Sequence, residues 1–333
     1  MATRQPFEMG LPSGDALIEI HTCISADSEV GSGVWLRAGS AVTETKIGKS
    51  CFVGFRSILA FADIGEGSMF ASRVNLQGAR GKRIRIGRNV WLGTSVTVAA
   101  GVTIGDGAVV AAGALVTADV GADEIAVGRP ARIVSKRQTA EDGFPDPSPI
   151  LNRVRQRAAQ GLPTFLDESS LSSARPIAEG GLVNWRVSGS TFVDAELAGG
   201  EGVSIDEGCI LIGRSAQKGG ISPRGGIHLG SRTRVASSVI VEGAGGLVVG
   251  EDSEIGSGVT IVTSTHDHRF RSLPWVEAPV TIGPRCVIGE GSVIVGPVNI
   301  GEGATVEPYS VVIRDVQAGH LSRGVVSIQE TKK

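Results

Sequence analysis

Aliphatic residues recur at every sixth position in two stretches of the chain. The first stretch runs from Ile86 to Val116, and the second runs from Ile282 to Val312. A spacing of six is a multiple of the two-residue period of a β-strand but not of the 3.6-residue period of an α-helix, so these side chains can share one face only in strands. If about a quarter of positions were Ile, Leu or Val, six in phase would arise by chance roughly once in four thousand. The chain therefore carries a repeat, and carries it twice.

Each repeat combines a large inward residue with a small one. Four residues after each aliphatic position stands a small or β-branched residue, such as Val90 or Ala108, and glycine commonly follows the aliphatic residue where the chain must turn. This pattern predicts a narrow three-sided solenoid. Cys51, Cys209 and Cys286 all occupy the small inward position, so we expect buried, unreactive thiols there.

The six-residue spacing is broken at corresponding points of the two copies. Ten residues separate Leu76 from Ile86 in the first copy, twenty-one separate Ile261 from Ile282 in the second, and regular repeats follow each break. A regular solenoid has no pocket, so function is expected where the spacing is broken. The second break holds two of the five histidines and the first holds none. By composition alone, the second loop is either a solvated polar loop or a functional one; we expect an inactive first copy and a catalytic second copy.

The chain resembles the hexapeptide-repeat acyltransferases. The resemblance rests on "IGRNVWLG" and "VTIGDGAVVAAGALVTADV" in the first copy, and on "TSTHDH" upstream of "TIGPRCVIG" in the second. It implies an all-β fold of two tandem left-handed parallel β-helix domains joined by a partly helical linker. The left-handed turn is taken from the family, because ordinary parallel crossovers are right-handed.

The spacing is lost between the two copies. Ser148 and Pro149 open an apolar pattern that ends at Gly161, which predicts a short helix with Ser148 as its N-cap. The flanking stretches, rich in Pro, Ser and acidic residues, are typical of a linker. We predict an N-terminal extension over residues 1–20, a first β-helix domain over 21–137, a linker with a short helix over 138–180 and a second β-helix domain over 181–333.

The resemblance implies a coenzyme A-dependent acyltransferase with acetyl-CoA as acyl donor and no metal. The implied acceptor is a hydroxyl or amine of a sugar or sugar-containing small molecule. Transfer from a thioester needs a base that takes the acceptor's proton and returns a proton to the departing thiolate, and histidine, which titrates near neutral pH, can do both. His266 matches the family's catalytic position, and His268 is the fallback. In an extended loop His268 would share the side of His266, whereas Asp267 would point away.

Other residues of the loop and of the closing segment complete the implied site. Trp275 offers a face for a sugar ring, with packing of the loop base as the alternative, and Arg314 stands where relatives carry a lysine near the coenzyme. The second copy closes with "HLSRGVVSIQ", which departs from the family's closing segment. The candidate substrate-binding residues are Thr265, Asp267, Arg269 and Trp275. The candidate coenzyme-binding residues are Arg314 and, in "AVGRPARIV", Gly128, Arg129, Pro130, Ala131 and Arg132.

Basic residues gather at two places in the first copy. One group, at the break, comprises Arg80, Lys82, Arg83, Arg85 and Arg88; the other, in and after the closing segment, comprises Arg129, Arg132, Lys136 and Arg137. Each group is either a solvated face or a site for phosphates of coenzyme A or of a nucleotide-linked or acidic sugar.

Composition narrows the function classes. A net charge of −2 and a pI near 6.2 give no reason to expect nucleic acid as a partner. The sequence has no run of 18 apolar residues and no start resembling a signal peptide, which predicts no membrane span and a cytoplasmic location. Hexapeptide-repeat acyltransferases are trimers with active sites between neighbouring β-helices. The resemblance therefore implies that this chain forms a homotrimer.

Two alternatives to the acyltransferase stay open. A non-catalytic β-helix scaffold or interaction protein is favoured by the degenerate first copy. A γ-type carbonic anhydrase has the same three-sided β-helix fold, but it needs three zinc-binding histidines on regular coils.

Overall fold

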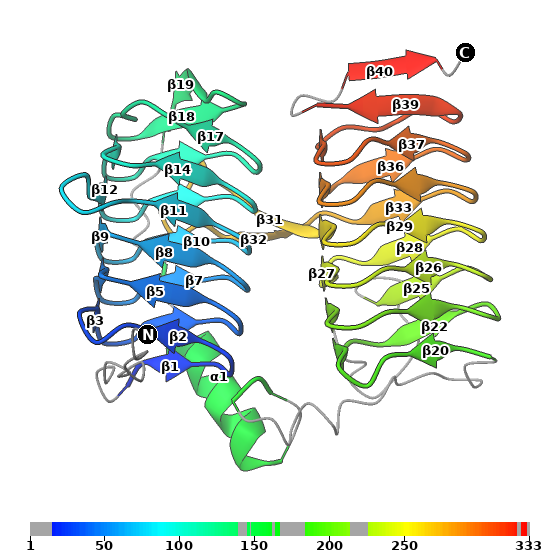
Figure 1. Ribbon diagram of the computed structural model, residues 1–333, viewed down its shortest axis with the longest axis horizontal. Helices are drawn as coiled ribbons and strands as arrows, with labels where there is room; N and C mark the ends of the chain where they lie inside the picture. Colours follow the sequence, from blue (N-terminus) through cyan, green and yellow to red (C-terminus); the bar gives the residue numbers. More distant parts are fainter. Residues whose placement is uncertain are drawn as a thin grey trace, which may run out of the picture. The chain divides into compact units, whose positions relative to one another are not determined.

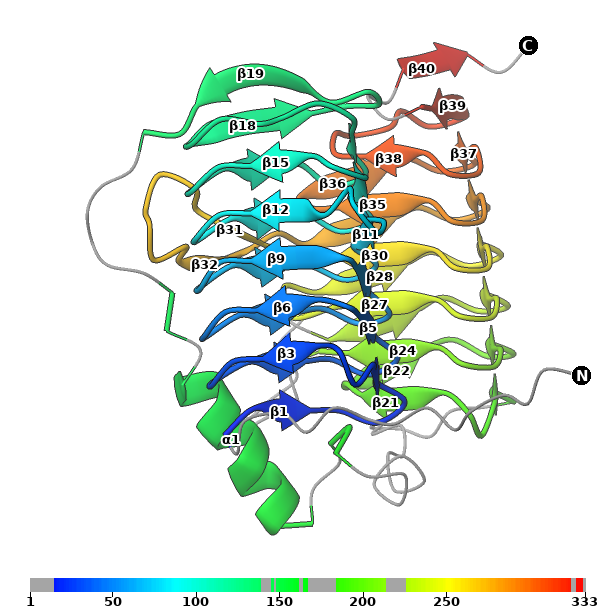
Figure 2. The same ribbon diagram turned by 60° about the vertical axis from the view of Figure 1, so that its left-hand side comes forward.

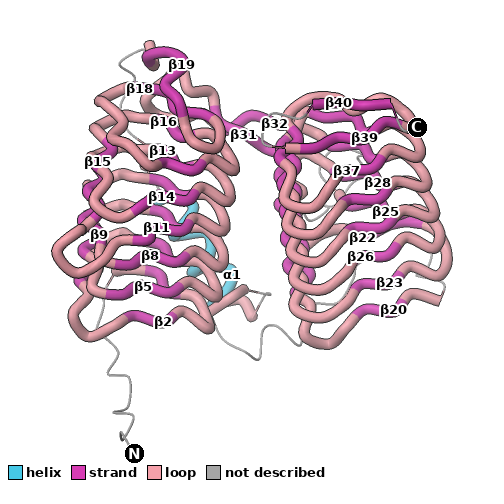
Figure 3. Tube along the Cα trace, turned by 45° about the horizontal axis from the view of Figure 1, so that its top comes forward, coloured by secondary structure: helices cyan, strands magenta, loops and turns pink. Residues whose placement is uncertain are grey.

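The structure, a computed structural model, describes residues 15–138, 145–146, 148–161, 164–166, 184–213, 226–324 and 328–331. The chain divides into two compact units (Figure 1). Unit 1 comprises Met1–Glu168 and His268–Pro274, and unit 2 comprises Ser169–Asp267 and Trp275–Lys333. Each unit contains one parallel β-helix, whose short strands are joined by turns (Figure 3). The predicted all-β fold of two tandem β-helices is confirmed.

The described strands of unit 1 form three sheets, one for each side of the coil. The first sheet has the order β1 (Leu17–Ile18), β4 (Trp35–Leu36), β7 (Phe52–Val53), β10 (Met69–Phe70), β13 (Trp91–Leu92), β16 (Val109–Val110), β18 (Glu124–Val127) and β19 (Arg132–Lys136). The second has the order β17 (Leu115–Val116), β14 (Thr97–Ala99), β11 (Asn75–Gln77), β8 (Ile58–Ala60), β5 (Ala41–Thr43) and β2 (Cys23–Ile24). The third, visible as a column in Figure 2, has the order β15 (Thr103–Ile104), β12 (Ile84–Ile86), β9 (Ala62–Ile64), β6 (Lys46–Ile47) and β3 (Glu29–Val30).

The described strands of unit 2 repeat this plan. Its first sheet has the order β20 (Arg186–Val187), β23 (Ser204–Ile205), β26 (Arg234–Val235), β29 (Glu254–Ile255), β34 (Val287–Ile288), β37 (Thr305–Val306), β39 (His320–Arg323) and β40 (Ile328–Thr331). The second has the order β21 (Phe192–Asp194), β24 (Ile210–Ile212), β27 (Ile240–Glu242), β30 (Thr260–Val262), β35 (Val293–Val295) and β38 (Val311–Val312). The third has the order β22 (Leu197–Gly199), β25 (Ile227–Leu229), β28 (Leu247–Val249), β33 (Val280–Ile282) and β36 (Val298–Ile300).

The six-residue spacing builds the core by placing the aliphatic side chain of one coil beside the equivalent side chain of the next coil. Parallel register places Leu92 beside Val110 one coil later, and Leu36 beside Val53. These inward side chains are fully buried, and burying one side chain of this size stabilises the fold by about 1.5–3 kcal/mol. Cys51, at the small inward position, is 1% exposed, and burial raises the pKa of its thiol to about 12. Cys209 and Cys286 are also buried, as predicted.

Residues that tolerate left-handed backbone angles mark one corner of successive coils. Gly67, Asn89, Gly107 and Asp123 have φ values of 68°, 54°, 69° and 56°. Gly, Asn and Asp are the residues that adopt this conformation most readily. Each N–H at this corner donates to a carbonyl one coil earlier, as Gly107 does to Arg88 at 2.8 Å. The corner therefore stacks with the same regularity as the strands.

An antiparallel hairpin closes each β-helix. In unit 1, β18 pairs antiparallel with β19, and in unit 2, β39 pairs antiparallel with β40. The N–H of Leu115 donates to the carbonyl of Gly128 at 3.0 Å, and the N–H of Val311 donates to that of Gly324, also at 3.0 Å. The described residues of "HLSRGVVSIQ", 320–324 and 328–329, therefore form the same kind of closure as "AVGRPARIV", a similarity that the two sequences do not reveal.

The predicted helix forms as α1 (Ser148–Ala159). Leu151 is its buried residue, and it packs with Leu17 and Trp35, which lie on two neighbouring coils of unit 1. The Ser148 N–H donates to Asp146 Oδ1 at 2.9 Å, so Asp146 rather than Ser148 supplies the capping oxygen. No helix in the described part of the chain is long and apolar enough to cross a membrane.

Candidate active site

The second break forms a hairpin that departs from the coil. Its strands are β31 (Ser264–His266) and β32 (Trp275–Glu277), paired antiparallel with His266 opposite Trp275. Residues that face each other across an antiparallel pair point to the same side. The imidazole of His266 and the indole of Trp275 therefore share one face. His266 is half-buried, and Trp275 is 41% exposed.

Buried backbone contacts fix the base of this hairpin. Thr263 is fully buried; its hydroxyl donates to the Glu242 carbonyl at 3.1 Å and accepts from the Gly245 N–H at 2.8 Å. The Ala278 N–H donates to the Thr263 carbonyl at 2.8 Å. A Cβ on Gly245 would lie 1.9 Å from the Thr263 carbonyl oxygen, and one on Gly296 would lie 1.9 Å from that of Ala278. Only glycine allows the neighbouring turns to approach the hairpin base this closely.

The tip of the loop, His268–Pro274, belongs to unit 1. The guanidinium of Arg137 donates from Nε to the His268 carbonyl at 2.8 Å and from Nη2 to the Phe270 carbonyl at 2.6 Å. The third nitrogen, Nη1, donates to the Gly107 carbonyl at 3.2 Å. The His268 ring lies 5.9 Å from that of Trp91, at an interplanar angle of 58°. The tip is therefore held by defined contacts.

The two candidate bases have different surroundings. Strand β31 ends at His266, and residues 268 and 269 form a turn. The extended backbone on which the expected shared side depends therefore ends before His268. Thr265 lies on β31 opposite Val276, Asp267 follows the strand half-buried, and Arg269 is exposed in the turn.

The predicted coenzyme-binding residues lie at the C-terminal end of each β-helix, in or near its last coil. Gly128 to Ala131 form the turn between β18 and β19, Arg132 begins β19, and the Ala131 N–H donates to the Leu115 carbonyl at 2.7 Å. Arg129 and Arg132 are exposed, and so is Arg314, which follows β38 in unit 2. These cations stand at the surface of their units.

An aspartate at the corresponding position of each copy, Asp315 and Asp119, has a structural role. Asp315 accepts a hydrogen bond from the Asn299 N–H at 2.7 Å, and Asp119 accepts one from the Thr103 N–H at 2.8 Å. Each carboxylate joins the last coil to the coil before it. Asp315 thus has a partner within the β-helix, whereas the neighbouring Arg314 is exposed.

The comparison with known proteins matches the two stretches of the chain in which the six-residue spacing is regular. The family model of the bacterial transferase hexapeptide, described as six repeats, matches residues 83–118 and 279–314. These two stretches carry the hexapeptide repeat that the family model describes. This hexapeptide-repeat protein carries the family match once in each β-helix, directly after each break in the spacing.

Several relatives match part of this hexapeptide-repeat chain. It is 33% identical over 142 residues to the bifunctional protein GlmU of Polaromonas naphthalenivorans, covering 40% of this chain and 28% of that protein. It is 29% identical over 100 residues to the serine acetyltransferase of Mycobacterium tuberculosis, covering 30% of this chain and 43% of that one. The chain thus spans less than half the length of these relatives.

Two complexes are among the solved structures that match part of the chain. AntD, an N-acyltransferase from Bacillus cereus in complex with dTDP and 3-hydroxybutyryl-CoA, is 18% identical with a TM-score of 0.36, covering 50% of this chain and 88% of that one. PerB from Caulobacter crescentus, in complex with CoA and GDP-perosamine, is 24% identical with a TM-score of 0.25, covering 39% of this chain and 58% of that one.

The basic group at the first break is largely paired within unit 1. Arg83 donates two hydrogen bonds to Asp63, at 2.8 and 3.0 Å, and holds the pKa of that carboxyl below its ordinary value. Arg88 likewise donates to Asp106, through its backbone N–H at 2.8 Å and its guanidinium at 2.9 Å. Because these arginines already face carboxylates, the structure favours the solvated face over a phosphate site at this break.

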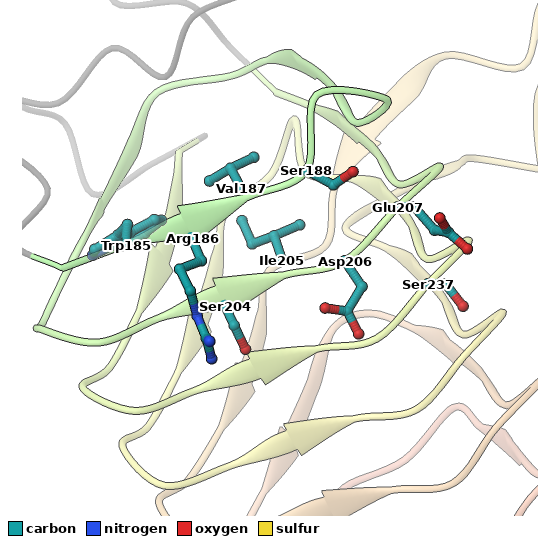
Figure 4. Close-up of a pocket in the computed structure, with 9 residues that line it drawn as sticks. All are labelled: Trp185, Arg186, Val187, Ser188, Ser204, Ile205, Asp206, Glu207 and Ser237. Carbon is teal, nitrogen blue, oxygen red and sulfur yellow. The ribbon is translucent and has the colours of Figure 1, made fainter.

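Unit 2 also contains a pocket among its first coils (Figure 4). Its volume is about 760 Å³, and Trp185, which donates to the Gly200 carbonyl at 2.7 Å, stands at one side of it. The lining residues are Trp185, Arg186, Val187, Ser188, Ser204, Ile205, Asp206, Glu207 and Ser237. None of the predicted site residues lines it. Within the described residues, no three His, Cys, Asp or Glu side chains gather as they would around a metal ion.

Proposed function

We propose that the chain is a coenzyme A-dependent acyltransferase in which His266 is the general base. The observation that carries this proposal is the pairing of His266 with Trp275 on a hairpin that leaves the second β-helix at the break in its repeat. The donor is acetyl-CoA, and the acceptor is a hydroxyl or amine of a sugar-containing small molecule. The partial match to a serine acetyltransferase supports acetyl transfer as the reaction.

The proposed reaction uses one base twice. The imidazole of His266 takes the proton from the acceptor O–H or N–H as the oxygen or nitrogen attacks the thioester carbonyl. The tetrahedral intermediate then collapses, the C–S bond breaks, and the imidazolium gives the proton to the departing thiolate sulfur. Acetylated acceptor and free coenzyme A leave, and His266 is again neutral.

The acceptor would bind on the face that His266 shares with Trp275. An indole that is 41% exposed presents an apolar surface on which the C–H face of a sugar ring can lie. Thr265, Asp267 and Arg269, on β31 and in the turn after it, are the proposed hydrogen-bonding residues for the acceptor. His268 is the second candidate base, placed in the turn.

The coenzyme has two proposed sets of contacts. One is Arg314 in unit 2, and the other is the segment from Gly128 to Arg132 in unit 1. Exposed arginines suit the phosphates of the coenzyme because a guanidinium binds phosphate through two parallel hydrogen bonds. Separate Arg314→Gln and Arg129→Gln variants, compared by their KM for acetyl-CoA, identify which set is used.

We also propose that the chain assembles as a homotrimer, as the family resemblance implies. Light scattering on the purified full chain checks this. A mass of about three chains supports it, and a stable monomer contradicts it.

The central experiment measures thiol release from acetyl-CoA against a panel of acceptors. The panel contains simple amino sugars, L-serine, dTDP-4-amino-4,6-dideoxyglucose and GDP-perosamine. We expect acceptor-dependent thiol release that is lost in His266→Ala with an unchanged circular dichroism spectrum. Absence of release with every acceptor would contradict the enzyme and favour the non-catalytic scaffold.

A further inference from the structure

We propose that Arg137 is a positioning residue that holds the loop carrying the base, an inference that rests on the proposed function of His266. Arg137 follows β19 in unit 1 and is 6% exposed. Its guanidinium donates two hydrogen bonds to the loop tip, to the carbonyls of His268 and Phe270.

The geometry of these bonds explains why the residue is an arginine. A guanidinium presents several N–H groups in one plane. Nε and Nη2 lie on the same edge of that plane and donate to two carbonyls two residues apart, while Nη1 donates to the Gly107 carbonyl. A lysine ammonium cannot reproduce this planar arrangement. The loop tip is thus fixed at two backbone atoms by one rigid group.

The anchor itself is rigid. Gly107 sits at the stacked corner of the coil, and its N–H donates to the Arg88 carbonyl at 2.8 Å. The backbone N–H of Arg137 donates to the carbonyl of Asp123, the next residue of the same corner. Arg137 is therefore tied to two consecutive coils.

The outer face of the first sheet of unit 1 is suited to packing. Its outward positions, in register, are Leu17, Trp35, Phe52, Met69, Trp91, Val109 and Ile125. The corresponding positions in unit 2 are Arg186, Ser204, Arg234, Glu254, Val287, Thr305 and Leu321. Only the first set is apolar throughout. Trp91 of that set contacts His268, so apolar packing and the Arg137 hydrogen bonds act on the same segment.

The consequence concerns His266, which precedes the anchored His268 by two residues. The chain is fixed at Thr263 on one side of His266 and at His268 and Phe270 on the other. A base held in this way spends more time in the reactive geometry, and a misplacement of about 1 Å can reduce a rate by about a hundredfold. Arg137 touches neither the acceptor nor the thioester in this proposal.

Two readouts on the full chain test it. The loop tip contains Arg269 and Arg271, so trypsin cleavage after these residues, followed by mass spectrometry, reports whether the tip is held. The second readout is the kcat and the KM for acetyl-CoA in the thiol-release assay. The variants are Arg137→Met, Arg137→Lys, His266→Ala and, as a matched control, Arg153→Met on the exposed side of α1.

We expect Arg137→Met to be cleaved in the loop at least about tenfold faster, with kcat reduced about 10- to 100-fold and KM for acetyl-CoA within about twofold. Arg137→Lys should fold as the parent does and give intermediate values of both, and Arg153→Met should change neither. Cleavage of Arg137→Met and Arg137→Lys at the parent rate would overturn the proposal. Faster cleavage with unchanged kcat would also overturn it.

The design separates this inference from the proposed function. Should His266→Ala retain turnover, His266 is not the base and the proposed function fails, while the cleavage rates still decide whether Arg137 holds the tip. Should no acceptor in the panel support turnover, the cleavage rates decide in the same way.

Discussion

His266 and Trp275 lie directly opposite each other across the β31–β32 pair, so an imidazole and an exposed indole project from the same face of one hairpin. Nine positions of chain separate them, and the loop tip between them is fixed to Arg137. This relationship gives the break in the second repeat both a proton acceptor and an apolar surface.

Replacing the base should remove activity without unfolding the chain. We expect His266→Ala to lower kcat by about 10²- to 10⁴-fold, the usual contribution of a general base. Steady-state thiol release from acetyl-CoA measures the loss, and circular dichroism checks the fold. His228→Ala, at an exposed position on β25, is the control and should match the parent. Near-parental turnover in His266→Ala would remove this residue from the mechanism.

Replacing the indole should weaken acceptor binding selectively. We expect Trp275→Ala to raise the KM for the acceptor about tenfold, equivalent to about 1.4 kcal/mol, with the KM for acetyl-CoA unchanged. Trp275→Phe retains an aromatic face and should lose much less. Equal KM values for the acceptor in Trp275→Ala and the parent would show that Trp275 only packs the base of the loop.

A side chain at Gly245 should displace the hairpin. The added Cβ would lie 1.9 Å from the Thr263 carbonyl oxygen, so the backbone must shift. We expect Gly245→Ala to destabilise the chain by about 1–3 kcal/mol and to reduce turnover. Gly189→Ala, where a Cβ would meet no atom within 4 Å, is the matched control for denaturant unfolding. Identical midpoints for the two variants would contradict this account.

The four thiols should differ in reactivity. Cys51, Cys209 and Cys286 are buried, and burial raises the pKa of Cys51 to about 12, whereas Cys23 is exposed. Since the thiolate is the reactive form, a thiol reagent should label one cysteine in the native chain and four after denaturation. Cys23→Ser should abolish native labelling. Rapid native labelling of Cys51 would show that the core opens.

The ion pair between Arg83 and Asp63 should stabilise the chain only above the titration range of Asp63. The hydrogen bonds and charge of Arg83 hold the pKa of Asp63 below its ordinary value of 3.8. Because the folded pKa is depressed, the stabilisation is complete above the unfolded pKa and is lost as pH falls through the folded pKa. Both side chains are partly exposed, so we expect Asp63→Asn to cost no more than about 0.2–1 kcal/mol at neutral pH.

Denaturant unfolding at pH 7 and at about pH 2 checks this prediction. The difference between Asp63→Asn and the parent should vanish at the acidic pH. A difference that grows on acidification would mean that the pair is not the source of the effect.

The sequence predicted the parts of the fold that depend on side-chain period. The inward rows containing Leu92 and Val110, and the burial of Cys51, follow from a six-residue spacing that only strands can satisfy. The position of the candidate active site was predictable for a related reason, since an interruption of the six-residue spacing can be identified directly in the amino-acid sequence. The outline of α1 was predictable from its apolar pattern and the glycine at its end.

The sequence could not predict features that depend on contacts with backbone atoms, because the positions of these atoms follow only from the folded structure. Arg137 is recognisable only as one of several basic residues, because its partners are the carbonyls of Gly107, His268 and Phe270. The end of β31 at His266 is set by the register of the hairpin, which the loop sequence does not specify. The closure of the second β-helix shares little with the first except a glycine at the same distance from the last coil, Gly324 for Gly128.

The antiparallel strands β19 and β40 affect whether further coils can be added to the end of each β-helix. A stack of parallel coils ends in unsatisfied N–H and C=O groups onto which a further coil, from the same or another molecule, could add. An antiparallel final strand no longer presents the parallel edge that the next coil requires. Each β-helix of this chain is therefore closed by a reversed strand on one of its three sides, which hinders a further coil from continuing the stack there.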